Sequence, residues 1–88
     1  MMDNYTINAQ NVINFIYNEV APELEKSQGV TLYKLAVYPI TTWKGFHVVM
    51  TFGDDSIGEF DVSFRAETVE EVKNRDYDSI IEEAIYNA

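Results

Sequence analysis

Apolar residues recur at helical spacing through the first quarter of the chain. Asn, Gln and Glu lie between them, which predicts an amphipathic helix over about residues 8–20. Pro22 lacks a backbone N–H and crowds the preceding turn, so we expect the helix to kink or restart near Ala21. Gly29 suits a left-handed C-cap and is expected to close this helical region.

Three strands are predicted after this helix. The segment from Val30 to Tyr38 is rich in β-branched and aromatic residues, and Pro39 is expected to end it. In residues 46–52, Phe46, Val48, Met50 and Phe52 alternate with His47, Val49 and Thr51, and residues 59–65 alternate between apolar and polar side chains, which is typical of strands with one face on the core. Residues 53–58 should join these two strands as a hairpin, because Gly and Asp favour turn conformations.

The end of the chain has a helical pattern with one interruption. Thr68 and Glu71 match a capping box, with Thr68 as the N-cap. The apolar spacing is interrupted at residues 74–76 and then resumes towards the C-terminus. Asp76 or Asp78 could cap a separate final helix, so one kinked helix and two short helices both fit the sequence.

These elements predict an α+β fold in the order α-β-β-β-α(α). Consecutive strands usually pair as neighbours, so we expect a three-stranded antiparallel meander with helices packed on one face. Eighty-eight residues suffice for one domain, and we expect residues 1–88 to form a single compact domain.

The same order of elements resembles that of the double-stranded-RNA-binding domain. That resemblance implies a basic clamp on phosphates at the start of the last helix. Residues 67–71 read Glu-Thr-Val-Glu-Glu at that position, so RNA binding of this kind is not expected.

The negative charge is concentrated in the last 35 residues of the chain. The formal net charge is −9: residues 1–53 hold four acidic and three basic side chains, and residues 54–88 hold eleven acidic and three basic ones. Such asymmetry indicates a partner, although acidic side chains also keep small proteins soluble. The candidate acidic binding surface consists of Glu59, Asp61, Glu67, Glu70, Glu71, Asp76, Asp78, Glu82 and Glu83.

Composition excludes several classes of ligand and site. An isoelectric point near 4.2 argues against direct binding to nucleic acid or to an anionic membrane. The absence of Cys excludes disulfides and thiolate metal sites. We see no secretory signal and no apolar run of about 18 residues, so we expect a cytoplasmic protein that does not enter a membrane.

The sequence offers little support for catalysis, and we predict no enzyme, cofactor or metal. His47, the single histidine, alternates out of phase with the core and is expected on the exposed face, near Glu59 or Asp61. Asp54 and Asp55 join these two acids in a cluster of the kind that attracts Ca²⁺, but EF-hand spacing is absent. We interpret them as turn and surface residues.

The segment between the first two predicted strands contains the single Trp. Trp43 lies in this segment and Tyr38 flanks it, and both residue types are enriched at the centres of protein interfaces. The alternative is that Trp43 folds back onto the small core. Tyr38 and Trp43 are therefore candidate anchors for a partner.

We infer a small, non-enzymatic protein that binds or inhibits a basic, nucleic-acid-binding protein. Its sharper form is a nucleic-acid mimic, whose carboxylates replace phosphates. In general character the chain is similar to the anti-restriction and anti-CRISPR inhibitors of phages and other mobile elements. One alternative is a self-associating structural or adaptor module, such as a homodimer formed through the second sheet face. Another is a small hydrolase or metal-dependent enzyme that uses His47 with Glu59 or Asp61.

Overall fold

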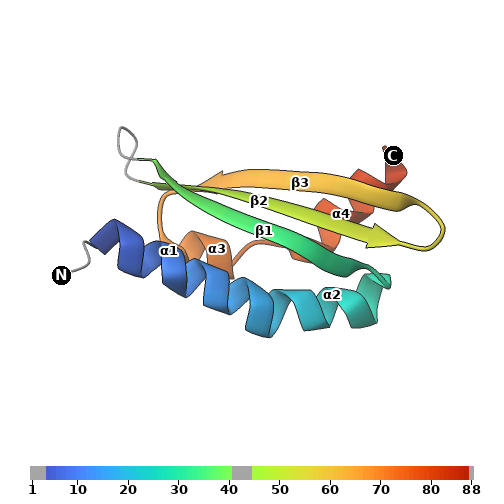
Figure 1. The fold of residues 1–88 in the computed structure, drawn as a ribbon, viewed down its shortest axis with the longest axis horizontal. Helices are drawn as coiled ribbons and strands as arrows, with labels where there is room; N and C mark the ends of the chain where they lie inside the picture. Colours follow the sequence, from blue (N-terminus) through green and yellow to red (C-terminus); the bar gives the residue numbers. More distant parts are fainter. Residues whose placement is uncertain (1–3, 41–44, 88) are drawn as a thin grey trace.

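The computed structural model describes residues 4–40 and 45–87. The element order is α1 (Asn4–Phe15), a π-helical segment η1 (Ile16–Val20), α2 (Ala21–Gln28), β1 (Thr31–Ile40), β2 (Gly45–Asp54), β3 (Gly58–Ala66), α3 (Val69–Lys73) and α4 (Tyr77–Tyr86). The molecule is elongated, with principal extents of 44, 23 and 20 Å (Figure 1). Among the described helices, none combines the length and the apolar character that crossing a bilayer requires.

The strands form an antiparallel sheet in the order β1-β2-β3, and the helices cover one of its faces (Figure 1). The predicted α+β meander is confirmed. The helix-facing side of the central strand carries Phe46, Val48, Met50 and Phe52, all buried. These residues occupy alternate positions, so strict period-two alternation gives β2 one buried face.

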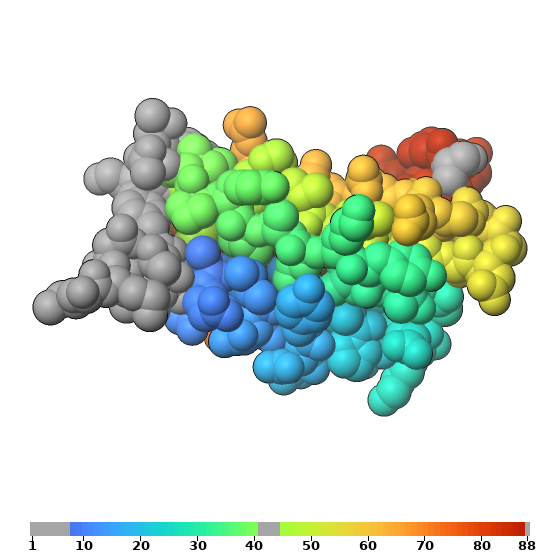
Figure 2. Space-filling view, viewed as in Figure 1, coloured from blue at the N-terminus to red at the C-terminus, as the bar shows by residue number. Residues whose placement is uncertain are grey.

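The helices lie in two rows beneath the sheet. The N-terminal row, α1 to α2, contacts β1, and the C-terminal row, α3 and α4, contacts β3. Figure 2 shows the side chains of the N-terminal row directly beneath those of β1 along the molecule. Val12, Ile16 and Leu24 from this row and Val72 and Ile81 from the other complete one core.

The N-terminal helical run changes geometry at the position where Pro22 interrupts it. The backbone N–H of Ala21 donates to the carbonyl of Ile16, five residues earlier, and a new α-helix starts at Ala21. Pro22 thus occupies the first turn of α2, where a missing N–H is tolerated. The predicted restart is confirmed, as is Gly29 as a left-handed C-cap with φ of +69°.

The first strand differs from its prediction at both a proline and a tyrosine. Pro39 lies inside β1 rather than ending it, because β1 is an edge strand and an edge position can do without an N–H. The pairing with β2 shifts between Leu32 and Lys34, so Tyr33 is an extra residue at a bulge. A Cβ on Gly53 would meet the Tyr33 ring, which therefore lies over this glycine.

The predicted hairpin between β2 and β3 is confirmed. The Asp54 carboxylate accepts hydrogen bonds from the backbone N–H of Ser56 at 2.8 Å and of Ile57 at 2.7 Å. The Ile57 contact, followed by the Ser56 hydroxyl, lowers the pKa of Asp54. Gly58 closes the turn with φ of +74°, a conformation that Gly adopts without steric cost.

Two short helices, rather than one kinked helix, form the C-terminal row. Thr68 caps α3 by accepting from the N–H of Glu71, whose carboxylate in turn accepts from the N–H of Glu67. Asp76, and not Asp78, caps α4 by accepting from the N–H of Ser79.

Candidate functional site

The structure exposes eight of the nine predicted binding carboxylates and half-buries Asp78. They do not share one flat face. Glu59 and Asp61 alternate out of phase with the core residues of β3, so they lie on the sheet face opposite the helices. The other seven belong to the C-terminal helical row or to the segments that cap it: Glu67, Glu70, Glu71, Asp76, Asp78, Glu82 and Glu83.

Five of these carboxylates also accept hydrogen bonds within the fold, among them Glu82, which accepts from the Gln28 side-chain amide at 3.3 Å. Asp61 accepts from the Thr51 hydroxyl at 2.7 Å, across the β2–β3 ladder. Glu71 and Asp76 accept from backbone N–H groups as helix caps. Asp78 accepts from the Ser27 hydroxyl at 2.6 Å, which ties α4 to α2.

The hydrogen bonds to these described carboxylates come from neutral groups. Their hydrogen-bond donors are hydroxyls, amides and backbone N–H groups, none of which carries a formal positive charge. The Ser27 contact, followed by one from Gln28, lowers the pKa of Asp78, so that carboxyl group stays ionised further into the acid range.

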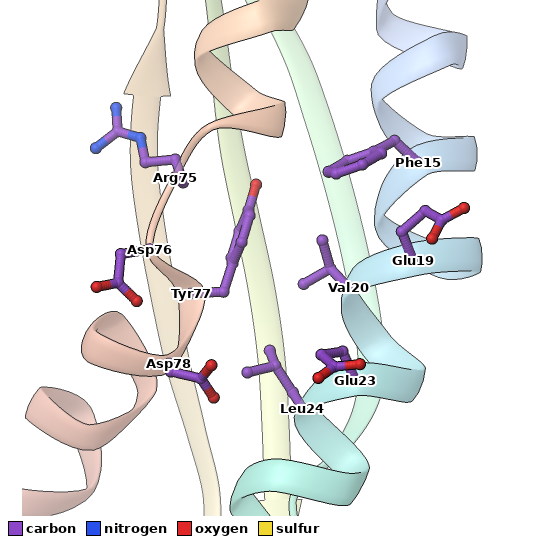
Figure 3. Close-up of a pocket in the computed structure, with 9 residues that line it drawn as sticks. All are labelled: Phe15, Glu19, Val20, Glu23, Leu24, Arg75, Asp76, Tyr77 and Asp78. Carbon is purple, nitrogen blue, oxygen red and sulfur yellow. The ribbon is translucent and has the colours of Figure 1, made fainter.

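A cleft of about 230 Å³ separates the two helical rows (Figure 3). Its floor is apolar and includes Val20, Leu24 and Tyr77. Its acidic lining residues come from both rows: Glu19, Glu23, Asp76 and Asp78. Tyr77 projects between the rows, and its hydroxyl donates to the carbonyl of Val72 at 2.8 Å, which ties the floor to the end of α3.

The contribution of Glu19 and Glu23 was missed by the sequence analysis. Both belong to the half of the chain that is nearly neutral, and charge counting gave them no weight. Their four-residue spacing, directly beside the buried Val20 and Leu24, is the signal that places them next to the core-facing side of a helix. Only the packing of α4 against α2 brings Asp76 and Asp78 to them.

A second groove, of about 350 Å³, runs between β3 and α4. Asp61 from the strand and Glu83 from the helix both line it, so the structure brings these two predicted residues together. Arg75 also lines it: its guanidinium lies 4.6 Å from the centre of the Phe64 ring and donates to the carbonyl of Arg65. Arg75 is thus held at one end of the groove.

The expected surroundings of His47 are wrong. His47 does lie on the face opposite the helices, but its cross-strand neighbours are Tyr38 and Arg65. The register pairs Asp61 with Thr51 and Glu59 with Gly53, further along the strand. Among residues 4–40 and 45–87, no three His, Asp or Glu side chains are grouped so that they could hold a metal ion.

Of the two aromatic residues predicted as anchors for a partner, the structure describes one. Tyr38 lies on the uncovered sheet face with 56% of its surface exposed, and its ring centre is 6.4 Å from that of His47. Trp43 lies outside the described residues.

No family model, curated protein or solved structure matches this chain. The site must therefore be interpreted from its own geometry and charge.

Proposed function

We propose that this protein is a small, non-enzymatic binding protein whose acidic surface docks on a basic surface of another protein. The observation that carries the proposal is the set of exposed carboxylates on β3, α3 and α4, whose hydrogen bonds come from neutral donors. Charge that is not neutralised within the molecule remains available to a partner. Complementary potentials of this kind raise association rates and select among partners.

The sharper form of this proposal is nucleic-acid mimicry. Duplex DNA presents one phosphate charge per roughly 1.7 Å of axis, and proteins that bind it offer elongated basic grooves. An elongated molecule of 44 × 23 × 20 Å with a net charge of −9 has the shape and sign to enter such a groove. The partner would then be a DNA- or RNA-binding protein, and the effect would be inhibition.

Affinity capture at two salt concentrations tests the proposal. Wild-type protein should retain a basic partner at about 50 mM salt and lose most of it at about 500 mM, because screening shortens the reach of the charges. The double variant Glu70→Gln, Glu83→Gln should weaken capture of the partner by about tenfold or more, because it removes two negative charges from the proposed surface. Neither carboxylate caps a helix, so we expect the variant to keep its fold.

A matched control separates the position of the charge from its amount. Gln10→Lys with Asn14→Lys changes the net charge by the same two units on exposed positions of α1. This variant should capture the partner nearly as well as the wild type. Equal weakening by both double variants would show that only the overall charge matters, and the proposed surface would be abandoned.

Competition distinguishes mimicry from other acidic contacts. A captured partner that binds nucleic acid should release the protein when duplex DNA or RNA is added in excess. If the partner holds the protein and the nucleic acid at the same time, the mimicry form of the proposal is wrong, while the acidic docking surface stands.

Self-association is the second candidate, and the uncovered sheet face favours it. Tyr33 and Tyr38, both on β1, are 54% and 56% exposed, and Val49 of the neighbouring strand β2, which pairs with Ala36, lies on the same face. Exposed aromatic residues on a face without helices are typical of an association surface. Tyr38→Ser should then shift a concentration-dependent dimer to monomer in light scattering. A mass that stays monomeric up to about 1 mM excludes a dimer of useful strength.

A further inference from the structure

The strand β3 lies at the edge of the described sheet, beside the acidic surface. One contact shows which of its backbone groups point outward. The guanidinium of Arg75 donates to the carbonyl of Arg65, and Arg75 lies outside the sheet. The backbone of Arg65 therefore faces away from β2.

In an antiparallel ladder the direction of the backbone N–H and C=O groups alternates from residue to residue, so the direction found at Arg65 gives that of the other residues in β3. Residues two apart direct their N–H and C=O groups to the same side. Glu59, Asp61 and Ser63 share this phase with Arg65, so their backbone groups also face away from β2. The residues between them pair with β2. Along Glu59–Ser63, β3 thus presents a row of hydrogen-bonding groups to which another strand can add.

The groove beside this edge supplies side-chain contacts. It is lined by four consecutive residues, 61–64, whose side chains alternate between the two sheet faces, so it follows the strand edge itself. On the helix-facing side it is bounded by Ile80 and Ala84 of α4, which are partly buried and apolar. On the other side of the sheet lie the carboxylates of Glu59 and Asp61.

We propose that the β3 edge binds an extended segment of a basic protein partner, which adds to the sheet as a fourth strand. The segment would alternate apolar residues with Lys or Arg. Its apolar side chains enter the groove against Ile80 and Ala84, and its basic side chains lie beside Glu59 and Asp61, because successive side chains of a strand point to opposite faces. This inference rests on the proposed function and names the kind of partner that it requires.

Charge favours such a partner over a second copy of the same chain. Two copies each carry a net charge of −9 and repel one another. Acidic side chains on an edge strand oppose pairing with an identical edge and attract a basic strand. Arg75 occupies the Arg65 end, which limits the site to the stretch Glu59–Ser63.

The probe for this site is a seven-residue capped peptide that alternates Lys and Val. In wild-type protein it should shift the backbone amide signals of Glu59, Asp61 and Ser63 by NMR, with a dissociation constant in the range of about 10–1000 µM. Two N-methylated forms of the peptide provide the decisive comparison, one methylated at its Lys residues and one at its Val residues. Their side chains and charge are the same.

Strand addition uses only alternate N–H groups of the peptide, so the two methylated forms must differ by at least about tenfold in affinity. A loss of affinity in the Lys-methylated form indicates that the peptide adds as an antiparallel strand. A loss of affinity in the Val-methylated form indicates that it adds as a parallel strand. Equal affinities, or no binding of the parent peptide, would overturn the proposal, because contact through charge alone does not distinguish the two forms.

A protein variant tests the same edge from the other side. Ser63→Pro removes an outward N–H and adds a ring at the edge, while the ladder to β2 keeps its donors. Ser63→Pro should lower the affinity for the parent peptide at least tenfold, and Ser63→Ala should leave this affinity unchanged. If Ser63→Pro loses its folded NMR spectrum, the methylated peptides on wild-type protein decide alone.

The experiments can refute the acidic docking surface and the strand-addition site independently of one another. Partner capture that depends on Glu70 and Glu83 but survives Ser63→Pro would retain the acidic surface and remove the strand-addition site. Peptide binding that follows the methylation pattern, without any captured partner, would retain the edge site and leave the acidic surface without support.

Discussion

Tyr77 joins the C-terminal helices to the sheet through one ring. The ring contacts Phe64 edge-on, with centres 5.8 Å apart, and the hydroxyl donates to the Val72 carbonyl. Burial raises the pKa of Tyr77, so the phenol stays a hydrogen-bond donor throughout the physiological range. The side chain therefore contributes both packing and a buried hydrogen bond.

Tyr77→Phe isolates the hydrogen bond. The variant keeps the ring and leaves the Val72 carbonyl without this donor, so the free energy of unfolding should fall by about 1–2 kcal/mol. Urea unfolding followed by circular dichroism measures the change. Tyr86→Phe is the control, since Tyr86 is 89% exposed and should change stability by less than about 0.5 kcal/mol. Equal effects in the two variants would contradict the role given to the Tyr77 hydroxyl.

Asp78 makes part of the stability depend on pH. Its pKa is lowered in the folded protein, first by the Ser27 hydroxyl and then by Gln28. A lowered folded pKa stabilises the native state above the unfolded value of about 3.9, and this contribution is lost as pH falls through the folded pKa. Stability measured between about pH 5 and 2 should therefore fall less steeply in Asp78→Asn than in the wild type. An unchanged acid slope would contradict the link.

At the scale of single residues, the sequence predicted side chains that act locally and missed those that act across the fold. The Thr68 cap and the acidic turn at Asp54 depend on neighbours within three residues, and both are present. The surroundings of His47 depend on the register between strands, which alternation alone does not determine. The placement of Glu23 and Asp78 in one cleft depends on how α4 packs against α2, which the pattern of either helix alone does not determine.

At the scale of elements, Gly58 determines how the β2–β3 hairpin closes. Its φ of +74° is costly for residues with a Cβ, although nothing lies within 4 Å of where that Cβ would be. Gly58→Ala should lower the free energy of unfolding by about 1–2 kcal/mol, through backbone conformation alone. Gly58→Asn should lower the free energy of unfolding less than Gly58→Ala does, because Asn tolerates a positive φ better than Ala. Thermal unfolding of both variants measures the difference, and an equal loss would point to a cause other than backbone conformation.

The elements themselves could largely be predicted, because their periodicity reflects which side faces the core. The boundaries were harder where backbone geometry was irregular. A π-helical turn before Pro22 and a bulge at Tyr33 each add one residue to a regular pattern, and neither has a sequence signature of comparable strength. Pro39 was taken as a strand end because its place on an edge strand follows only from the assembled sheet.

At the scale of the whole molecule, the sequence showed where charge lies along the chain but not in space. Division at residue 53 predicted an acidic half, and the structure distributes its carboxylates over both the open sheet face and the C-terminal helical row. The cleft between the rows adds Glu19 and Glu23 from the other half. Helix packing, rather than order along the chain, therefore defines the electrostatic surface.

The outward-facing backbone of β3 has a further consequence for how the protein behaves in acid. At pH 7 two copies of the chain each carry a formal net charge of −9, which opposes the pairing of identical β3 edges. Near the isoelectric point of about 4.2 the net repulsion disappears, while the outward-facing N–H and C=O groups of β3 remain. We expect concentrated protein to aggregate in this range with a rise in β-structure, measured by turbidity and thioflavin fluorescence. Ser63→Pro should delay this aggregation and Ser63→Ala should not, so the strand proposed to recruit a partner is also the one that limits the protein's solubility in acid.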